Sequence, residues 1–482
     1  MTPMMVRDVV AGLEAELRGE LLPNRRVTSI ERDSRSVSPG DVFIAIRGER
    51  FDGHDFVEDA RSHGAVAAIV ARDWADAAGR PNEFPLLVVD DTVVALQRLA
   101  RSVRRARGDR LTVVGITGSI GKTSTKEVVA AVLSGHFSTY RSPGNLNNEI
   151  GVPLSLLEVS PRDQVAVLEM AGAYAFGELA LLATIAQPSV AVVTNVYPVH
   201  LERMGTIEAI AETKAELVQA LDEQGVAILN GDDPRVRAMA DMTSARVIMY
   251  GLGADNDVRG DEVMSEGLKG TRFRLHLDGD QYWIRVPLIG GHAVQLALAG
   301  FAVGHGLGMH ISEMLPGFDG QDVQVRLLIV AGPNGSQVID DTYNASPPSV
   351  LSALGLLSEL RGTRTIAVLG DMRELGALTD EEHRVVGRRA AEVADLVVTY
   401  GDLARIIADE VTSAVKAHDG QATGVRSFAE TERDALITYL RSELREGDVV
   451  LIKGSRGLQM ETIVSAITQP TPGPEHDPER AA

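Results

Sequence analysis

Residues 111–123 read Leu-Thr-Val-Val-Gly-Ile-Thr-Gly-Ser-Ile-Gly-Lys-Thr, an apolar run followed by a glycine-rich turn and a lysine. The apolar run predicts a buried parallel strand, and the residues from Lys122 onward predict a helix. The glycines let backbone N–H groups face inward, and the helix N-terminus adds partial positive charge. Lys122 can then reach terminal phosphates, and the Thr123 hydroxyl can ligate Mg²⁺. This stretch therefore predicts a site for the phosphate chain of a nucleotide.

The glycine spacing in this stretch differs from that of the commonest phosphate-binding loop. Between Gly115 and Gly121 there is one residue more than that loop has between its two glycines. Between Gly118 and Gly121 there are two fewer. The plain alternative is a glycine-rich strand-to-helix turn with a lysine at the surface. Because the Gly-Lys-Thr triplet directly follows an apolar run, we favour nucleotide binding.

The rest of the chain repeats the alternation of apolar runs and helical patterns. Around the glycine turn, further strands are predicted at residues 165–168, 190–194 and 225–229. A later series predicts strands at residues 337–340, 365–369, 396–400 and 448–452. This alternation predicts an α/β protein of three domains. They are a small N-terminal α/β domain (1–108), a central doubly wound, mostly parallel sheet with the phosphate loop (109–312), and a C-terminal Rossmann-like domain (313–468), followed by a disordered tail (469–482).

The composition argues against a protein that binds nucleic acid or a membrane. The formal net charge is −20, whereas proteins that bind a phosphate backbone usually carry a basic face. A short basic stretch at residues 101–110 precedes a predicted strand, and we interpret it as a solvated linker. The chain has no cysteine, no run of 18 apolar residues and no N-terminal signal-peptide pattern. We expect a cytoplasmic monomer.

Polar residues follow two predicted strands of the central sheet. Glu169 ends one apolar run, and His200 lies shortly after the next. The carboxyl ends of parallel strands meet at one edge of a sheet, so both are candidates for holding a metal ion beside the loop. Glu169 can equally be an ordinary strand-end acid, and an isolated histidine is usually packed or solvated. Lys214 lies in a helical pattern, and from the sequence alone we expect it to be a solvated surface lysine.

Taken together and in this order, the motifs resemble the Mur ligases of peptidoglycan synthesis, and within them the MurF type. The first domain contributes residues 33–35 (Asp-Ser-Arg), 39–43 (Pro-Gly-Asp-Val-Phe) and 52–54 (Asp-Gly-His). The second contributes residues 118–127, 145–153 and 200–202, and the third contributes residues 340–345, 370–376 and 453–456. Each motif is weak alone, whereas the ordered series covers nearly the whole chain and is highly specific.

The resemblance implies an ATP-dependent ligase that adds D-alanyl-D-alanine to UDP-N-acetylmuramoyl-tripeptide through an acyl phosphate, with two Mg²⁺ ions. It implies nucleotide contacts from Gly118, Ser119, Gly121, Lys122, Thr123, Ser124, Arg326, Asp341 and Asn344. It implies metal contacts from Thr123, Glu169, His200 and a carbamylated Lys214, with Lys122, His200 and Lys214 as catalytic residues. The UDP-sugar-peptide would contact Asp33, Ser34, Arg35, Asn147 and Asn148, and the dipeptide would contact Arg373, Lys453, Ser455 and Arg456.

Several positions depart from the family pattern. Ala293 and Leu296 stand where two asparagines are usual, one of which normally helps to hold the nucleotide base. Tyr197 replaces a common glycine, Ser346 replaces an asparagine, and Arg326 lacks the glycine that usually precedes it. We therefore expect a rearranged base site and a Tyr197 ring that crowds the metal site.

Three alternative interpretations remain open from the sequence. A MurE-type ligase, which adds the third amino acid, is a close alternative, and the runs at residues 145–148 and 340–345 favour the MurF type over it. A catalytically idle member that binds its ligands without turnover is suggested by the missing asparagines. An unrelated ATPase or kinase with a phosphate loop would explain residues 115–123 but not the motifs outside them.

Overall fold

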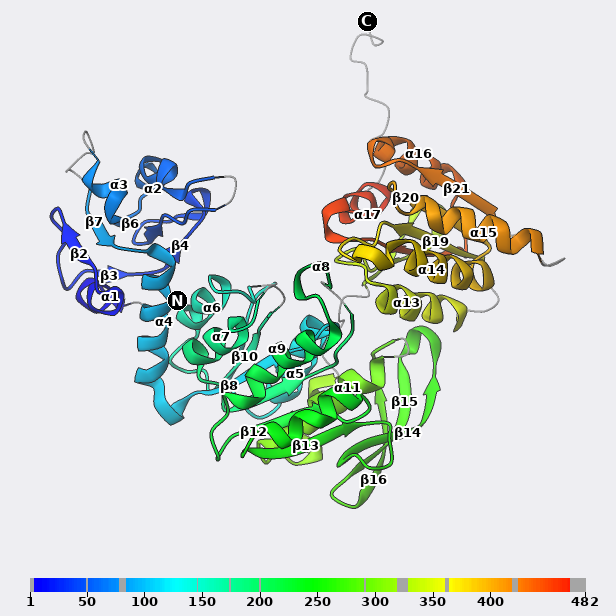
Figure 1. The fold of residues 1–482 in the computed structure, drawn as a ribbon, viewed down its shortest axis with the longest axis horizontal. Helices are drawn as coiled ribbons and strands as arrows, with labels where there is room; N and C mark the ends of the chain where they lie inside the picture. Colours follow the sequence, from blue (N-terminus) through cyan, green and yellow to red (C-terminus); the bar gives the residue numbers. More distant parts are fainter. Residues whose placement is uncertain are drawn as a thin grey trace, which may run out of the picture.

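The structure is a computed structural model, and it describes residues 4–48, 51–77, 84–144, 146–172, 175–198, 201–289, 292–318, 328–359, 364–417 and 424–468. Three large sheets follow one another along the chain, each with helices packed against it (Figure 1). This confirms the predicted three-domain α/β fold class. No helix within the described residues is long and apolar enough to cross a membrane.

The first unit is built on a five-stranded sheet in the order β2-β7-β6-β5-β4. Only β2 runs antiparallel to its neighbour. The elements are β1 (Met4–Met5), α1 (Val6–Leu13), β2 (Glu16–Arg18), β3 (Arg26–Val27), β4 (Ile30–Glu31), η1 (Ser34–Ser36), β5 (Val42–Ile44), η2 (Gly53–Phe56), α2 (Val57–Ser62), β6 (Ala67–Ala71), α3 (Arg72–Asp76) and β7 (Leu86–Val89). β5, β6 and β7 are buried along their whole length, as parallel strands covered on both faces must be.

The middle unit carries a nine-stranded sheet in the order β16-β15-β14-β13-β12-β11-β8-β10-β9. The strands are β8 (Thr112–Thr117), β9 (Thr139–Arg141), β10 (Val165–Glu169), β11 (Val190–Val193), β12 (Val226–Asn230), β13 (Arg246–Gly251), β14 (Val258–Ser265), β15 (Thr271–Leu277) and β16 (Asp280–Val286). The helices are α5 (Lys122–Leu133), α6 (Gly151–Glu158), α7 (Glu178–Ala186), α8 (Leu201–Met204), α9 (Ile207–Gln219), α10 (Pro234–Arg237), α11 (Ala293–Gly306) and α12 (Ile311–Met314). β14, β15 and β16 form an antiparallel extension of the otherwise parallel sheet, which the sequence patterns did not predict.

The third unit has a six-stranded sheet in the order β17-β18-β22-β19-β20-β21, antiparallel only at β17. Its strands are β17 (Leu328–Ala331), β18 (Gln337–Asp340), β19 (Thr365–Gly370), β20 (Leu396–Tyr400), β21 (Gly424–Phe428) and β22 (Val449–Lys453). Its helices are α13 (Pro347–Glu359), α14 (Thr379–Val393), α15 (Arg405–Ala417), α16 (Arg433–Glu443) and α17 (Glu461–Thr468). The structure therefore has a parallel sheet with helical crossovers here, as the sequence predicts.

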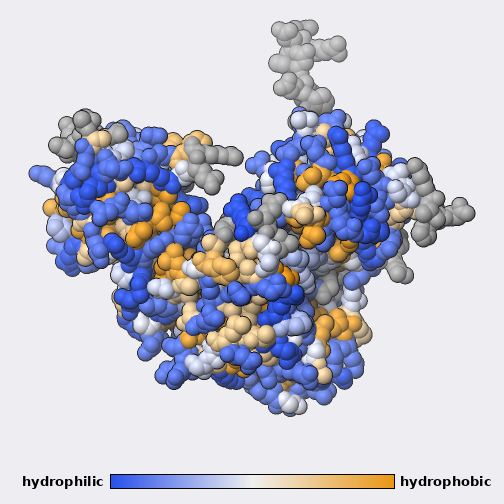
Figure 2. All heavy atoms as spheres, in the orientation of Figure 1, coloured by the Kyte–Doolittle hydropathy of each residue, from blue (hydrophilic) through white to orange (hydrophobic). Residues whose placement is uncertain are grey.

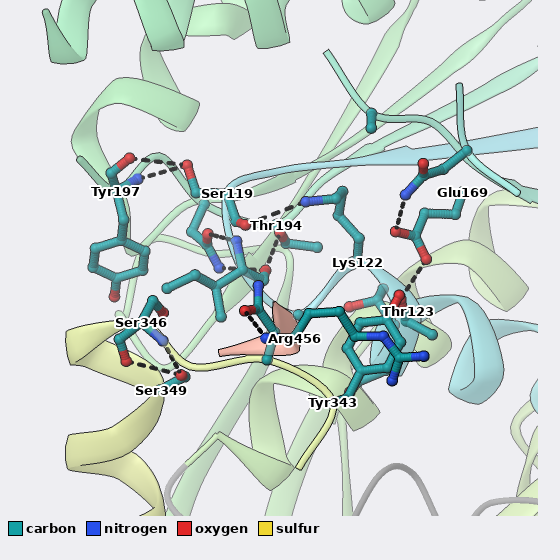
Figure 3. A pocket seen from close by; sticks show the side chains of 18 of the residues that line it. Ser119, Lys122, Thr123, Glu169, Thr194, Tyr197, Tyr343, Ser346, Ser349 and Arg456 are labelled. Carbon is teal, nitrogen blue, oxygen red and sulfur yellow. Dashed lines mark hydrogen bonds between the residues drawn. The ribbon is translucent and has the colours of Figure 1, made fainter. Parts of the chain in front are cut away.

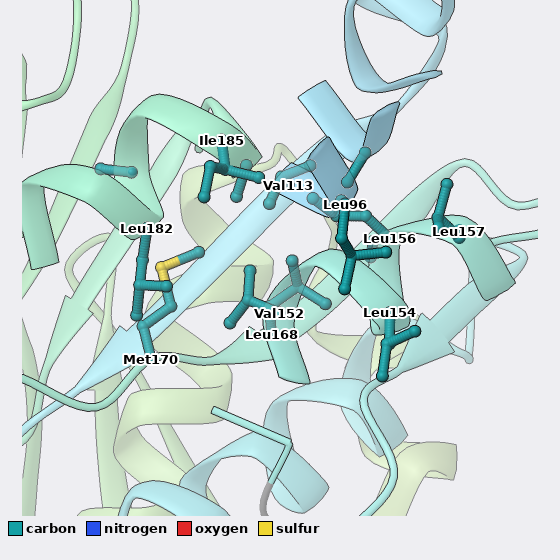
Figure 4. Packing of buried hydrophobic residues seen from close by; sticks show 14 of the residues in the cluster. Leu96, Val113, Val152, Leu154, Leu156, Leu157, Leu168, Met170, Leu182 and Ile185 are labelled. Atoms are coloured by element: carbon teal, nitrogen blue, oxygen red, sulfur yellow. The ribbon is translucent and has the colours of Figure 1, made fainter. Parts of the chain in front are cut away.

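Helix α4 (Thr92–Arg107) connects the first unit to the middle unit. Leu96 of α4 packs with Val152 and Leu156 of α6 and with Leu182 of α7 in one continuous apolar cluster (Figure 4). This arrangement ties the first unit to the middle sheet through buried surface rather than through a flexible connection.

The basic stretch at residues 101–110 is therefore not a solvated linker, and that interpretation was wrong. Arg104 is 7% exposed and donates to the carbonyl oxygens of Ala186 (2.9 Å) and Gln187 (3.0 Å), at the C-terminus of α7. Arg107 donates to the carbonyl of Ser160 (2.8 Å). These arginines donate hydrogen bonds to backbone carbonyl groups that follow a helix, where a cation is favoured. A charge pattern cannot reveal this, because these acceptors lie 53 to 83 residues away along the chain.

The core of the middle unit extends beyond the boundary expected at residue 312. Met314 and Phe318 belong to the buried cluster formed by α5 and α11. The first and third units stand as two lobes above the middle unit, with a hollow between them (Figure 2). The carboxyl ends of the middle strands and of β18 and β22 lead to the residues of the site described next.

Candidate active site

The loop between β8 and α5 is shaped by two glycines. Gly118 (φ 145°) and Gly121 (φ 82°) adopt backbone conformations that side chains disfavour. A Cβ atom at Gly118 would lie 2.0 Å from Oγ1 of Thr194, so no side chain fits there. Helix α5 begins at Lys122, directly after Gly121, and the first N–H groups of a helix have no partner within it. The loop therefore offers N–H donors and positive helix charge to an anion.

Residues at the end of β11 hold this loop in shape. The side-chain amide of Asn195 accepts a hydrogen bond from the N–H of Ile120 (2.9 Å) and donates one to the Ile120 carbonyl (3.0 Å). Thr194 donates to the same carbonyl (2.8 Å). The carbonyl of Asn195 accepts from the N–H of Ser119 (3.0 Å). The adjacent strand thus fixes the turn that the sequence predicted from glycines alone.

Lys122 keeps its ammonium group at the loop. Its Nζ donates to the carbonyl oxygens of Gly118 (2.8 Å) and Ser119 (3.2 Å) (Figure 3). Lys122 also lines the cavity described below. A phosphate chain held by the N–H groups of the loop would therefore meet this charge.

Two oxygen-bearing side chains meet beside the loop. The hydroxyl of Thr123 donates to Oε2 of Glu169, and Nδ2 of Asn147 donates to Oε1 of Glu169 (2.8 Å) (Figure 3). Glu169 is the last residue of β10 and is 3% exposed. Mg²⁺ at phosphate sites takes one or two carboxylates together with phosphate oxygens and waters. Thr123 and Glu169 are a donor set of that kind, and they fit the ion.

A fully buried lysine links α5 to the loop that carries Asn147. Lys126 has 0% of its surface exposed, and its Nζ donates to the carbonyls of Ser142 (2.5 Å) and Gly144 (3.2 Å). Its Nζ also lies 3.0 Å from a carboxylate oxygen of Glu127. Lys126 therefore positions the backbone that leads to Asn147, from the helix that also begins the phosphate loop.

We expect Lys126→Met to destabilise the protein by about 3 kcal/mol, because it leaves two carbonyls without their buried donor. The measurement is the midpoint of urea unfolding. Lys269→Met is the matched control, since Lys269 is exposed, and it should change stability by less than about 0.5 kcal/mol. Equal stability losses in the two variants would show that the Lys126 contacts do not hold this loop.

Lys214 lies in α9 (Ile207–Gln219) and is not the surface lysine that its surroundings in the sequence suggest. It is 4% exposed, and its Nζ donates to the carbonyl of Gly172. Burial, reinforced by the charge of Lys122, lowers the pKa of the Lys214 ammonium to about 7. Near neutral pH a large fraction of this side chain is therefore an uncharged, nucleophilic amine.

The third unit supplies the opposite wall of the site. Asp341 directly follows β18, and its carboxylate lies 2.6 Å from Nζ of Lys453, the last residue of β22. Lys453 also donates to the carbonyl of Asn344 (2.9 Å) and is 3% exposed. Asp341 and Asn344, expected at the nucleotide, and Lys453, expected at the dipeptide, therefore form one cluster. The ammonium of Lys453 orients the other two residues.

Two arginines lie at the surface of this wall. The guanidinium of Arg456 stands 5.5 Å from the ring centre of Tyr343, within range of a cation–π contact (Figure 3). The backbone N–H of Arg373 donates to Oγ of Ser455 (2.9 Å), and its guanidinium lies 2.7 Å from a carboxylate oxygen of Glu430. Both arginines are thereby oriented before any ligand binds.

A cavity of about 1320 Å³ lies between these walls. From the middle unit it is lined by Ser119, Gly121, Lys122, Thr123, Ser124, Asn147, Asn148 and Glu169. From the third unit it is lined by Asp341, Asn344, Arg373, Lys453, Ser455 and Arg456. The structure therefore gathers most of the expected nucleotide, metal and substrate residues around one space.

The first unit meets this cavity through a residue that the motifs did not single out. Arg32 lines the cavity, whereas Asp33, Ser34 and Arg35 lie outside its described lining. The carboxylate of Asp33 accepts from the Arg35 side chain (2.6 Å), and Ser34 is 6% exposed. Asp33 and Arg35 thus pair locally, and their expected contact with the UDP-sugar stays a prediction.

Other lining residues were also missed by sequence reasoning. They include Glu178, Tyr250, Gln295, Tyr343 and Glu374. The motif at residues 370–376 could have identified Glu374, but only its arginine was considered as a site residue.

His200 and Arg326 lie outside the described residues. Among the residues that are described, no group of three or more His, Cys, Asp and Glu side chains is arranged to hold a metal ion.

The positions that depart from the family pattern are partly explained. Ala293 is fully buried, whereas Leu296 and Gln295 line the cavity, and Nε2 of Gln295 donates to Asp232 (3.3 Å). The side-chain amide of Gln295 therefore still reaches this wall, one position before Leu296.

Tyr197 does not crowd the Thr123–Glu169 pair, because its ring lies on the far side of Ser119 (Figure 3). Its backbone bonds with the Ser119 hydroxyl (2.9 and 3.0 Å) account for that position.

Three family models, all of Mur ligase domains, match consecutive parts of the chain. The Mur ligase family, catalytic domain, matches residues 26–104, and the Mur ligase middle domain matches residues 116–304. The Mur ligase, glutamate ligase domain, matches residues 325–456. The order of these matches is the order of the three sheets.

Proteins similar over the full length carry one activity in their names. The chain is 34% identical over 472 residues to a UDP-N-acetylmuramoyl-tripeptide–D-alanyl-D-alanine ligase of Bacillus subtilis, covering 97% of this chain and 99% of that one. A crystal structure of MurF from Acinetobacter baumannii superposes with a TM-score of 0.83 at 30% identity, covering 97% and 99%. MurF from Thermotoga maritima in complex with ADP has a TM-score of 0.75 at 31% identity, covering 91% and 97%.

Proposed function

The chain belongs to the Mur ligase family, and from this membership we propose that it is an ATP-dependent ligase of the MurF type. It joins D-alanyl-D-alanine to UDP-N-acetylmuramoyl-tripeptide in peptidoglycan synthesis. ATP supplies the driving force, and ADP and phosphate leave with the new amide. The observation that carries the proposal is the cavity shared by Lys122, Thr123 and Glu169 on one wall and by Arg373 and Arg456 on the other.

The chemistry explains why a phosphate site and a carboxylate substrate must meet in one space. A carboxylate does not form an amide directly, because oxide is a poor leaving group. A carboxylate oxygen of the tripeptide attacks the γ-phosphorus of ATP, ADP leaves, and an acyl phosphate results. The amine of the dipeptide then attacks the acyl carbon, phosphate leaves, and the nitrogen loses a proton. Each step needs anionic and polar groups to be held close together.

The residues of the middle unit suit the first step. The N–H groups of the loop and the ammonium of Lys122 hold the phosphate chain and offset the repulsion between two anions. Thr123 and Glu169 would hold Mg²⁺, which would supply further positive charge next to the transferred phosphoryl group. Asn147, bonded to Glu169, and the neighbouring Asn148 would orient the muramoyl-peptide beside it.

We assign separate roles to the three units. The first unit binds the UDP-sugar, with Arg32 at the cavity facing its anionic part. The middle unit binds ATP, and the third unit brings Asp341 and Asn344 to the nucleotide and its two surface arginines to the dipeptide. Enclosure between units fits a reaction whose acyl phosphate must be kept from water.

Carbamylation of Lys214 is part of this proposal. A carbamate forms when a neutral amine attacks carbon dioxide and loses a proton, and the lowered pKa of Lys214 makes that neutral amine available. The product is an anion where a cation would otherwise lie near Lys122. We propose that this anion supports a second Mg²⁺ ion, together with His200.

The alternatives are less well supported. Relatives of the MurF type match over nearly the whole chain, which disfavours a MurE-type ligase and an unrelated kinase. The idle-protein interpretation rested on lost asparagines, and Gln295 offers an amide to the same wall. Lys122, Thr123 and Glu169 are all present and oriented.

We expect phosphate release from ATP to require UDP-N-acetylmuramoyl-tripeptide and D-alanyl-D-alanine together. A coupled phosphate assay, with each substrate omitted in turn, measures this dependence. Release that instead requires UDP-N-acetylmuramoyl-dipeptide and a diamino acid would identify a MurE-type enzyme. If no combination releases phosphate while ATP still binds, the protein is a binding member of the family and the proposal fails.

A further inference from the structure

The cavity wall next to the phosphate loop carries an exposed aromatic ring. Tyr197 is 40% exposed and lines the cavity, at a position where the family commonly has glycine. A single exposed aromatic side chain is ordinary on an open surface. This ring instead faces a space in which a nucleotide is expected, and a large aromatic face is well suited to binding a flat ligand. Its position therefore calls for a role in ligand binding.

The main chain of Tyr197 is fixed against the phosphate loop. Its N–H donates to Oγ of Ser119 (2.9 Å), and the Ser119 hydroxyl donates to the Tyr197 carbonyl (3.0 Å). The N–H of the preceding Val196 donates to the carboxylate of Asp233 (2.8 Å). The ring therefore projects from a rigid support, and such a support reduces the conformational freedom that is lost when a ligand packs on the side chain.

The ring lies where the base of a nucleotide is expected if its phosphates lie on the loop. Thr123 and Glu169, which suit Mg²⁺ and the reacting end of the phosphate chain, lie on one side of Ser119 (Figure 3). The Tyr197 ring lies on the other side. In ATP the ribose and base are attached at the end of the chain away from the transferred phosphoryl group. The base therefore extends away from the metal pair, toward the side of Tyr197.

The start of α13 forms the cavity wall that the ring faces. In Figure 3 the Tyr197 ring points toward Ser346 and Ser349, and Pro348 also lines the cavity there. Oγ of Ser349 donates to the Ser346 carbonyl (2.8 Å) and accepts from the Ser346 N–H (3.0 Å), so this hydroxyl is turned onto its own helix. Two small side chains and a proline ring therefore face the aromatic ring. Ser346 is shorter than the asparagine usual at its position, which leaves more space opposite Tyr197.

A side-chain amide borders the same part of the cavity. The half-buried Gln295 lines the cavity, and its Nε2 donates to Asp232 (3.3 Å), the residue before the Asp233 that holds Val196. A bond of this length is weak, so the amide can turn toward a ligand. An aromatic face and a nearby amide suit a purine, because the face stacks on its ring and the amide can bond its edge.

We propose that the ring of Tyr197 stacks on the adenine base of bound ATP, with the Gln295 amide at the edge of that base. This assignment rests on the nucleotide binding in the proposed function. It explains how the base is held although Ala293 and Leu296 replace two asparagines. A glycine at position 197 could not make this contact. Tyr197 therefore determines the affinity for the base, whereas the loop determines the affinity for the phosphates.

The kinetic test compares wild type with Tyr197→Ala, which keeps both main-chain bonds to Ser119 and removes the ring. We expect the KM for ATP to rise about tenfold, as loss of one base–aromatic stack produces, with kcat within about twofold of wild type. The inhibition constant of inorganic tripolyphosphate, which has no base, should stay within about twofold, because the loop is unchanged. Tyr197→Phe retains an aromatic ring and should bring the ATP KM back to within about threefold of wild type.

Trp283→Ala is the matched control for this comparison. It removes an aromatic side chain of the same unit that is 48% exposed and lies outside the cavity lining. Both the KM for ATP and the inhibition constant of tripolyphosphate should equal those of wild type in this variant.

A binding experiment gives a readout that needs no turnover. Tyr197→Trp places an indole at the proposed stack, and ADP should quench its fluorescence. Pyrophosphate, which carries the same phosphate linkage without a base, should not. Wild type supplies the background, because Trp74 and Trp283 both lie outside the cavity lining and their emission should change little with either ligand.

The outcomes separate this inference from the function on which it rests. If Tyr197→Ala keeps the wild-type KM for ATP, or weakens ATP and tripolyphosphate equally, the ring does not hold the base and the assignment is wrong. Equal quenching of Tyr197→Trp by pyrophosphate and ADP would also overturn it. If ADP alone quenches while no substrate combination releases phosphate, the ligase proposal fails and the base assignment stands. If wild type binds neither ATP nor ADP, both fail.

Discussion

Lys122→Ala should lower the rate of phosphate release at least about 1000-fold, which corresponds to about 4 kcal/mol of lost transition-state stabilisation. The ammonium of Lys122 lies on the carbonyls of Gly118 and Ser119, at the mouth of the loop that offers N–H groups to phosphates. Its removal leaves the transferred phosphoryl group facing an anionic acceptor without this charge. The measurement is substrate-dependent phosphate release at saturating ATP.

Two controls separate a catalytic defect from a folding defect in this variant. Lys269→Ala removes an exposed lysine of the same unit and should keep wild-type turnover. The thermal midpoint of Lys122→Ala should stay within a few degrees of wild type, because the lost side chain is only partly buried. Turnover within tenfold of wild type would show that Lys122 does not act on the phosphates.

Lys214→Ala should also be inactive, with turnover at least about 1000-fold below wild type. The reason differs from that for Lys122. If Lys214 acts as a carbamate, its replacement removes an anion and leaves space where the carbamate stood. A short carboxylate such as acetate or formate can enter that space, and we expect it to restore activity at least tenfold. Lys122→Ala is the matched control, because a carboxylate cannot replace a cation.

A second readout for Lys214 does not depend on activity. Carbon-13 bicarbonate should give a carbamate resonance in wild type that is absent in Lys214→Ala. Only the neutral amine reacts, and its fraction rises as the pH rises through the pKa of about 7. At constant dissolved carbon dioxide the resonance should be stronger near about pH 8 than near about pH 6. A folded Lys214→Ala that no carboxylate rescues, with no carbamate signal in wild type, would refute carbamylation.

The strands and helices that carry the phosphate site could be predicted from the sequence because their signals are local. The apolar run before Gly118 and the helix start at Lys122 are found where the spacing placed them, as β8 and α5. β18 and β20 match the apolar runs at residues 337–340 and 396–400 residue for residue. A buried parallel strand is a continuous apolar run, so it can be read without knowledge of its neighbours.

The antiparallel extension β14–β16 escaped prediction for the opposite reason. β15 alternates buried and exposed residues, including Arg272 and Arg274 on its outer face, so no continuous apolar run marks it. Its pairing with β14 and β16 is also set by turns rather than by helical crossovers. A half-exposed strand carries a weaker signal than a buried one.

The residues that can hold a phosphate chain could be identified from their local sequence, since glycine, lysine and threonine at that spacing need only their own backbone to do so. The properties of Lys214, Arg104 and Glu374 depend instead on how the chain folds. Burial turned the first into a weakly basic amine, distant carbonyls turned the second into a helix cap, and an anchored loop placed the third on the cavity wall. Desolvation and long-range partners create these properties, and neither can be inferred from the residues that are adjacent in the sequence.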